Sequence, residues 1–158
     1  MEFQRPNRTD PERIFVVVRN SYSTATLTNG QWCGWDIVTD KDGYSVTKIS
    51  GAIRAAPAGC VVESIPAGSY GLCQVWGYKS DARCLGGSGS ISTKITAGSP
   101  LYFRTSAFAA RNYSRTATVL KSIYGKFPCG IAIGPLNTAA IATYFATSGA
   151  YQVLVRCL

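Results

Sequence analysis

The chain has 158 residues, of which 46% are hydrophobic and 15% are charged, and its formal net charge is +8. This length fits one domain, and the apolar content is sufficient for a hydrophobic core. No apolar run reaches the roughly 20 residues that a transmembrane helix needs. The absence of histidine excludes Ser-His-Asp and Cys-His catalytic triads and histidine-bearing metal sites.

The charge is distributed unevenly along the chain. All eight acidic residues lie at or before Asp81, whereas the segment from Ala82 to Leu158 has eight basic residues and no acidic one. Such asymmetry favours an acidic partner, either a protein surface or a nucleic acid. Because the basic residues are dispersed, a solvated basic face is an equally good interpretation.

Residues 1–13 are polar, contain two prolines and have no hydrophobic periodicity. They predict an extended N-terminal arm or a disordered tail. Phe3 is an aromatic residue with no local apolar partner, which favours an arm anchored on another subunit. Residues 14–158 are predicted to form a single β domain, beginning with a strand at Ile14–Arg19 that is apolar on both faces and therefore expected to be buried on both.

The next segment contains turn signals and two tryptophans. Asn29-Gly30 and Asp40–Gly43 predict turns, and Tyr44–Ile49 alternates as a strand does. The Asp40–Gly43 run also resembles the start of a calcium-binding EF-hand loop, but the closing glutamate is missing. A plain turn is the better interpretation.

The stretch Gly59–Tyr78 predicts a β-hairpin at the centre of the fold. Two apolar runs, Cys60–Ile65 and Tyr70–Tyr78, are joined by Pro66–Ser69, whose proline and glycine suit a tight turn. On the second strand, large side chains alternate with Gly71, Cys73, Val75 and Gly77. One face is therefore nearly flat, and another sheet or chain could approach it closely.

The remainder of the chain repeats this pattern of short apolar runs between Gly, Pro and Ser. A loop is expected at Leu85–Ser90, and strands are expected within Ile91–Phe103, at Thr116–Ile123, at Gly130–Ile133 and at Tyr151–Cys157. Asn137–Ala146 suits a helix or a strand equally well. About ten short strands with such turns predict an all-β fold, an antiparallel sandwich or barrel that is jelly-roll-like, with the extended arm.

The sequence offers little for catalysis or cofactor binding. Because the N-terminal residues lack the apolar core of a secretion signal, the six cysteines are expected to stay reduced. Four of them lie within apolar runs and are expected to pack as small hydrophobic residues: Cys60, Cys73, Cys129 and Cys157. Glu63 is the one acid in a strongly apolar run, and an outward-facing strand position is expected for it. We expect no cofactor, no metal and no enzymatic activity.

A small basic β-barrel that binds single-stranded nucleic acid is an alternative function. Basic charge with exposed aromatic residues is typical of such proteins. However, Trp76 and Tyr78 are not interleaved with Lys or Arg on their strand, and the RNP and zinc-knuckle motifs are absent.

Three segments resemble the capsid decoration, or cement, proteins of tailed bacteriophages: GCVVESIPAGSYGLCQVWGY at Gly59–Tyr78, the Ile95–Leu101 unit and FPCGIAIG at Phe127–Gly134. The similarity lies in the order of these elements and covers Pro57–Leu158. It implies a β-rich virion protein, usually a homotrimer, that is assembled in the host cytoplasm. Such a protein would bind the major capsid protein on the outer surface of the shell and bridge its subunits. A tail or fibre component is a further alternative.

The candidate capsid or oligomer interface follows from the arm and the aromatic residues. It comprises Phe3, Arg5, Arg8, Arg13, Trp32 and Trp35. Aromatic residues are frequent interface anchors, although each tryptophan is equally compatible with the core.

Overall fold

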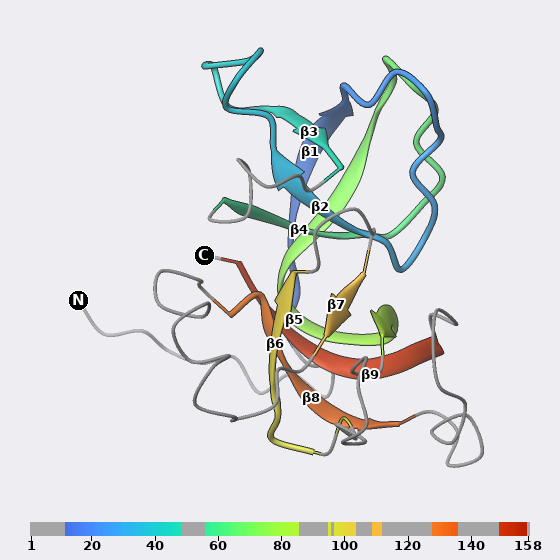
Figure 1. Ribbon diagram of the computed structural model, residues 1–158, viewed down its shortest axis with the longest axis vertical. Helices are drawn as coiled ribbons and strands as arrows, with labels where there is room; N and C mark the ends of the chain where they lie inside the picture. Colours follow the sequence, from blue (N-terminus) through green and yellow to red (C-terminus); the bar gives the residue numbers. More distant parts are fainter. Residues whose placement is uncertain are drawn as a thin grey trace, which may run out of the picture.

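The computed structural model describes residues 12–48, 56–85, 95, 97–103, 109–111, 128–135 and 149–157. These residues form strands and turns, which confirms the predicted all-β fold (Figure 1). The strands are β1 (Ile14–Asn20), β2 (Trp32–Trp35), β3 (Ser45–Thr47), β4 (Pro57–Val61), β5 (Tyr70–Leu85), β6 (Pro100–Phe103), β7 (Ala110–Arg111), β8 (Gly130–Pro135) and β9 (Gly149–Arg156). Within the described ranges, no helix has the length and apolar character needed to cross a membrane.

The strands close into two five-stranded barrels that share β5. The first has the order β1-β3-β2-β4-β5 and closes through pairing of β1 with β5. The second has the order β5-β7-β6-β8-β9 and closes through pairing of β5 with β9. In Figure 1 the first barrel occupies the upper half of the molecule and the second the lower half, with β5 running from one into the other.

The pairing departs in part from the antiparallel, jelly-roll-like arrangement that the sequence predicts. Most neighbours are antiparallel, but β1 pairs with β3 and β5 pairs with β7 in parallel. A jelly roll has two facing sheets, whereas these strands return to β5 twice and so form two rings. The barrel itself is the predicted architecture.

The central strand β5 changes partners halfway along its length. Its first part, Tyr70–Trp76, pairs with β1, and its second part, Trp76–Cys84, pairs with β9. At the changeover Gly77 has a φ of 99°, a backbone conformation that residues with a Cβ rarely adopt. A Cβ built there would lie 2.1 Å from the carbonyl oxygen of Glu12. The predicted flat face of this strand therefore receives the chain's own backbone.

The predicted hairpin and its turn are also present. Strand β4 pairs with β5 so that Cys60 lies opposite Gln74 and Val61 opposite Cys73. In the turn between them, the N–H of Ser69 donates to the carbonyl of Pro66 over 3.0 Å, and Gly68 has a φ of 78°. However, β5 continues to Leu85, well beyond the predicted end at Tyr78.

Each barrel has its own hydrophobic core. The first core contains Val18, Leu27, Cys33, Val46, Ala58, Val61, Ile65 and Cys73. The second contains Trp32, Cys60, Ala82, Cys84, Ile95, Leu101, Ala110, Cys129, Ala132, Tyr151, Val153 and Val155. Neighbouring residues of β2, Trp32 and Cys33, thus point into different cores, because successive strand residues face opposite sides.

The cysteines are free and contribute to these cores, as the sequence predicts. Five are buried, and Cys157 is half-buried. In the first core the sulfurs of Cys33 and Cys73 lie 3.7 Å apart. Burial raises the pKa of Cys84 to about 12. It also raises the pKa of Cys60 and Cys129 well above 9.0, so these thiols are protonated near neutral pH and pack as small apolar groups.

Several predicted elements fall outside the described residues. These are the arm over residues 1–11, the strand at Thr116–Ile123 and the segment Asn137–Ala146. The division into an arm and a single β domain stays a prediction. The turn at Asp40–Gly43 and the strand at the end of the chain are confirmed.

Candidate docking surface

An apolar strip lies on the outer face of the first barrel. It consists of Phe15 and Val17 of β1 with Tyr70 and Leu72 of β5, all of them exposed. Val17 lies directly opposite Leu72 in the strand pairing, so their side chains are neighbours on the same face. Val17 is 61% exposed and Tyr70 62%. These exposures are high for large apolar side chains on strands.

The exposed apolar side chains are concentrated rather than scattered. The described residues include nine exposed large hydrophobic side chains, of which five lie on β1 and β5: the four of the strip and Ile14. Three more, Ile37, Val38 and Tyr44, lie on the loop between β2 and β3, and the ninth is Ile133 of β8. Contiguous exposed apolar patches of this kind mark protein interaction sites more often than isolated side chains do.

Charged groups border the strip on two sides. Arg19, opposite Tyr70, is exposed, and its Nε donates to the carbonyl of Gly68 over 3.4 Å. On the other side Glu63 is also exposed, and its carboxylate accepts a 2.6 Å hydrogen bond from the N–H of Leu72. As predicted, Glu63 faces outward, although it follows the end of β4. The strip therefore has a cationic edge and an anionic edge.

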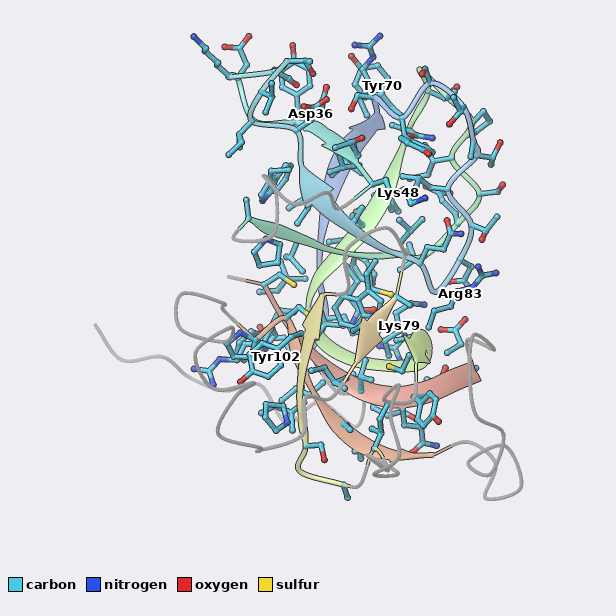
Figure 2. All side chains as sticks on the ribbon, in the orientation of Figure 1. Asp36, Lys48, Tyr70, Lys79, Arg83 and Tyr102 are labelled. Carbon is cyan, nitrogen blue, oxygen red and sulfur yellow. The ribbon has the colours of Figure 1, made fainter. Side chains whose placement is uncertain are left out.

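The 36–44 loop is held in place by its own carboxylates. Asp36 is buried and accepts hydrogen bonds from the hydroxyls of Ser21 and Thr39. Asp40 accepts from the N–H groups of Asp42 and Ser45, over 3.0 and 2.8 Å. These bonds fix the loop backbone, while Ile37 and Val38 stay exposed. Figure 2 shows Asp36 and Tyr70 at the same end of the molecule, so the loop begins near the end of the strip that Tyr70 occupies.

The carboxylates of the loop predict a loss of stability in acid. Burial alone would raise the pKa of Asp36, but hydrogen bonds from Thr39 and Ser21 outweigh it and lower this pKa below 3.8. A hydrogen bond from Ser45 lowers the pKa of Asp40. A lowered pKa in the folded state stabilises the fold above the unfolded value, and this contribution is lost as pH falls through the folded value. As the pH is lowered below about 4, where unfolded aspartates become protonated, we expect the midpoint temperature of unfolding to decrease. In Asp36→Asn this temperature should decrease less steeply with pH. An equal slope in that variant would contradict the assignment.

The predicted interface residues differ in how deeply the structure buries them. Arg13 is exposed and immediately precedes β1. Trp35 is half-buried against the first core. Trp32 is fully buried in the second core, so its prediction as an interface residue is wrong, and its side chain instead joins β2 to the second barrel. Phe3, Arg5 and Arg8 lie outside the described residues.

The sequence of the first strand indicates the strip, but the prediction that both faces of this strand are buried is wrong. Ile14–Arg19 is apolar on both faces, as predicted, yet only one face is buried in the first core. The other face, with Phe15 and Val17, points outward from the closed barrel. A continuous apolar run on a strand with one solvent-facing side is the signature of an interaction surface, which the burial prediction obscured.

In the described part of the chain, no three Cys, Asp or Glu side chains come together in a way that could hold a metal ion.

No family model matches this chain, and no curated protein matches it in sequence. Among solved structures, it is similar to the N base of the head fiber gp8.5 of bacteriophage phi29. The identity is 10% and the TM-score 0.47, over 92% of this chain and 96% of that chain.

Proposed function

We propose that this chain is a structural protein of a tailed-bacteriophage particle, a capsid decoration protein that acts by binding and catalyses no reaction. It binds the major capsid protein on the outer surface of the shell, bridges neighbouring capsid subunits and works as a homo-oligomer, with a homotrimer the expected form. It assembles in the host cytoplasm. The observation that carries the proposal is the exposed apolar strip of Phe15, Val17, Tyr70 and Leu72, because such a surface fits a protein partner.

Two further features support a role in adhesion. The segments at Gly59–Tyr78, Ile95–Leu101 and Phe127–Gly134 resemble decoration proteins. The segment from Ala82 to Leu158 has eight basic residues and no acidic one, which suits docking onto an acidic shell. Complementary charge of this kind mainly speeds and orients association.

The strip favours a protein partner over single-stranded nucleic acid. Nucleic-acid platforms stack bases on aromatic rings between several cations. Here the directly paired residues at the centre of the strip are Val17 and Leu72, which are aliphatic, and Glu63 borders them. The buried core of a contact between proteins is apolar and depleted of charged residues.

The proposal is tested by adding the purified chain to phage shells that lack it and measuring the bound fraction by sedimentation. We expect saturable binding to intact shells and protection of the capsid against thermal disruption. A variant without residues 1–11 should fold normally and bind shells more weakly. The deletion stops there because the backbone of Glu12 and Arg13 packs against Gly77. No binding by the full chain, with salt-sensitive retention on single-stranded DNA instead, would overturn the proposal.

A further inference from the structure

Strand β1 is paired along only one of its two edges for most of its length. Towards β5 it pairs from Ile14 to Arg19. Towards β3, its pairing among the described residues is confined to Arg19 and Asn20. The first barrel is therefore closed on this side by one end of β1 only. We call the β1 edge at Phe15 and Val17, on the side away from β5, the open edge.

Hydrogen bonds at the end of β1 show which backbone groups lie on the open edge. The N–H of Arg19 donates to the carbonyl of Tyr44 over 2.8 Å, on the β3 side. The N–H of Asn20 donates to the carbonyl of Ser69 over 2.9 Å, on the β5 side. Successive residues of a strand direct their backbone groups to opposite edges. The two residues of the open edge lie two and four positions before Arg19, so their N–H and C=O groups point as those of Arg19 do, away from β5.

The neighbouring strand gives the same result. Val17 lies opposite Leu72. The N–H of Leu72 donates to the carboxylate of Glu63 over 2.6 Å, and its carbonyl accepts from the N–H of Val62 over 3.2 Å. Because Leu72 uses both backbone groups on the side away from β1, Val17 and Leu72 form a non-hydrogen-bonded pair. The backbone of Val17 thus directs one donor and one acceptor to the open edge, where no described strand pairs with them.

We propose that the shell partner adds a strand to the open edge, with an extended segment of the partner hydrogen-bonding to the backbone of Phe15 and Val17. In strand addition, main-chain hydrogen bonds supply the affinity and side chains supply the specificity. The same two residues carry their side chains on the strip, so a partner bound to the strip already lies beside the open edge. This inference rests on the proposed function and specifies how the partner of the strip is held.

A second copy of the chain fits the open edge less well than a foreign segment does. If two β1 strands paired antiparallel so that both residues of each open edge were matched, Arg13 of each copy would lie opposite Arg19 of the other. Both arginines are exposed, and like charges directly opposite each other destabilise a strand pair. Glu12 would lie opposite the neutral Asn20 and would not compensate. Charged residues on edge strands are a common protection against such self-pairing.

Hydrogen exchange of the backbone amides tests the inference on the unaltered chain. In the free chain, the amides of Phe15 and Val17 should exchange faster than those of Val16 and Val18, which point towards β5. Adding phage shells that lack the protein should slow exchange at Phe15 and Val17 about tenfold or more. If these two amides were already protected in the free chain, or became protected as its concentration rose, the open edge would be occupied without the partner and the inference would be wrong.

A proline substitution tests the same backbone groups by binding. Val17→Pro removes an N–H of the open edge and leaves the hydrogen bonds between β1 and β5 in place, as edge strands tolerate. Its shell binding, measured by sedimentation, should be about tenfold or more weaker than that of Val17→Ala, which keeps the N–H and shortens the side chain. Equal binding by the two folded variants, or shell binding that leaves the two amides unprotected, would overturn this inference and leave the proposed function standing. If Val17→Pro does not fold, the exchange measurement decides.

A synthetic strand separates this inference from the proposed function. The peptide alternates valine and threonine over about nine residues and carries N-methyl groups along one edge, so that it pairs through the other edge only. If the chain does not bind shells, the proposed function fails and the peptide decides the inference. Slower exchange at Phe15 and Val17 in the presence of the peptide would support strand addition. Exchange no slower than with a control peptide methylated along both edges would overturn strand addition as well.

Discussion

Replacing Asp81 with alanine is expected to destabilise the protein more than replacing its partner Lys79 with methionine. Lys79 is 7% exposed, and its ammonium group lies 2.5 Å from the carboxylate of Asp81 and 2.9 Å from the amide oxygen of Asn29. Without Asp81, the buried ammonium group of Lys79 would keep only the amide oxygen of Asn29 among these two partners, and a buried charge without a counter-ion is destabilising. We expect a loss of about 2 kcal/mol, less than for a fully buried pair because Asp81 is 36% exposed.

Lys79→Met is the matched comparison. Methionine keeps most of the buried aliphatic chain and removes the cation, and Asp81 remains hydrogen-bonded to Asn29 and partly solvated. We expect a change within about 1 kcal/mol. Urea unfolding of both variants at pH 7 measures the difference. If Lys79→Met were the more damaging substitution, the ion pair would not be the reason for the effect.

This ion pair matters because Asn29 hydrogen-bonds to both of its members and so connects a turn of the first barrel to the second barrel. Asn29 belongs to the turn before β2, whereas Lys79 and Asp81 lie on the second part of β5, beside a bulge in its pairing with β9. In the same turn, the carbonyl of Gly30 accepts a 2.7 Å hydrogen bond from the N–H of Arg83. Loss of the pair therefore weakens the attachment of a first-barrel turn to the second barrel.

Gly77→Ala is expected to cost at least about 3 kcal/mol of the free energy of unfolding. The substitution places a Cβ on a residue with a φ of 99° and brings it against the carbonyl oxygen of Glu12, a backbone atom. Backbone strain costs about 1–3 kcal/mol and overpacking a similar amount. Chemical unfolding measures the loss, or the soluble yield does if the variant does not fold.

Gly43→Ala separates the two contributions to the Gly77 effect. Gly43 has a φ of 82°, but a Cβ there has no atom within 4 Å, so this variant suffers backbone strain alone. Its loss should be about 1 kcal/mol. If both substitutions reduced the free energy of unfolding equally, the contact with Glu12 would not contribute to the effect at Gly77.

Local patterns were sufficient to predict much of this fold. The hairpin around Pro66–Ser69 and the alternation of Tyr151–Cys157 appear as expected, because tight turns and two-residue periodicity are encoded by adjacent residues. In the last strand, Tyr151, Val153 and Val155 lie on one face and belong to the second core.

The double barrel could not be predicted in this way. Its closure depends on β5 exchanging β1 for β9 at Gly77, which is a pairing between segments far apart in the chain. Local sequence shows a glycine in an apolar run but not which backbone approaches it. The candidate site was misplaced for a related reason: Trp32 looked like an interface anchor, yet only the tertiary structure shows which side of β2 meets the second core.

The strand common to both rings also limits how this protein can evolve. Loops of either ring can lengthen or vary in sequence without opening a barrel. An exchange of one ring for another by recombination would instead have to break the chain within β5, a hydrogen-bonded strand, and would leave the remaining ring with a gap. The two rings are therefore expected to be inherited together, with new binding properties arising by changes on their surfaces.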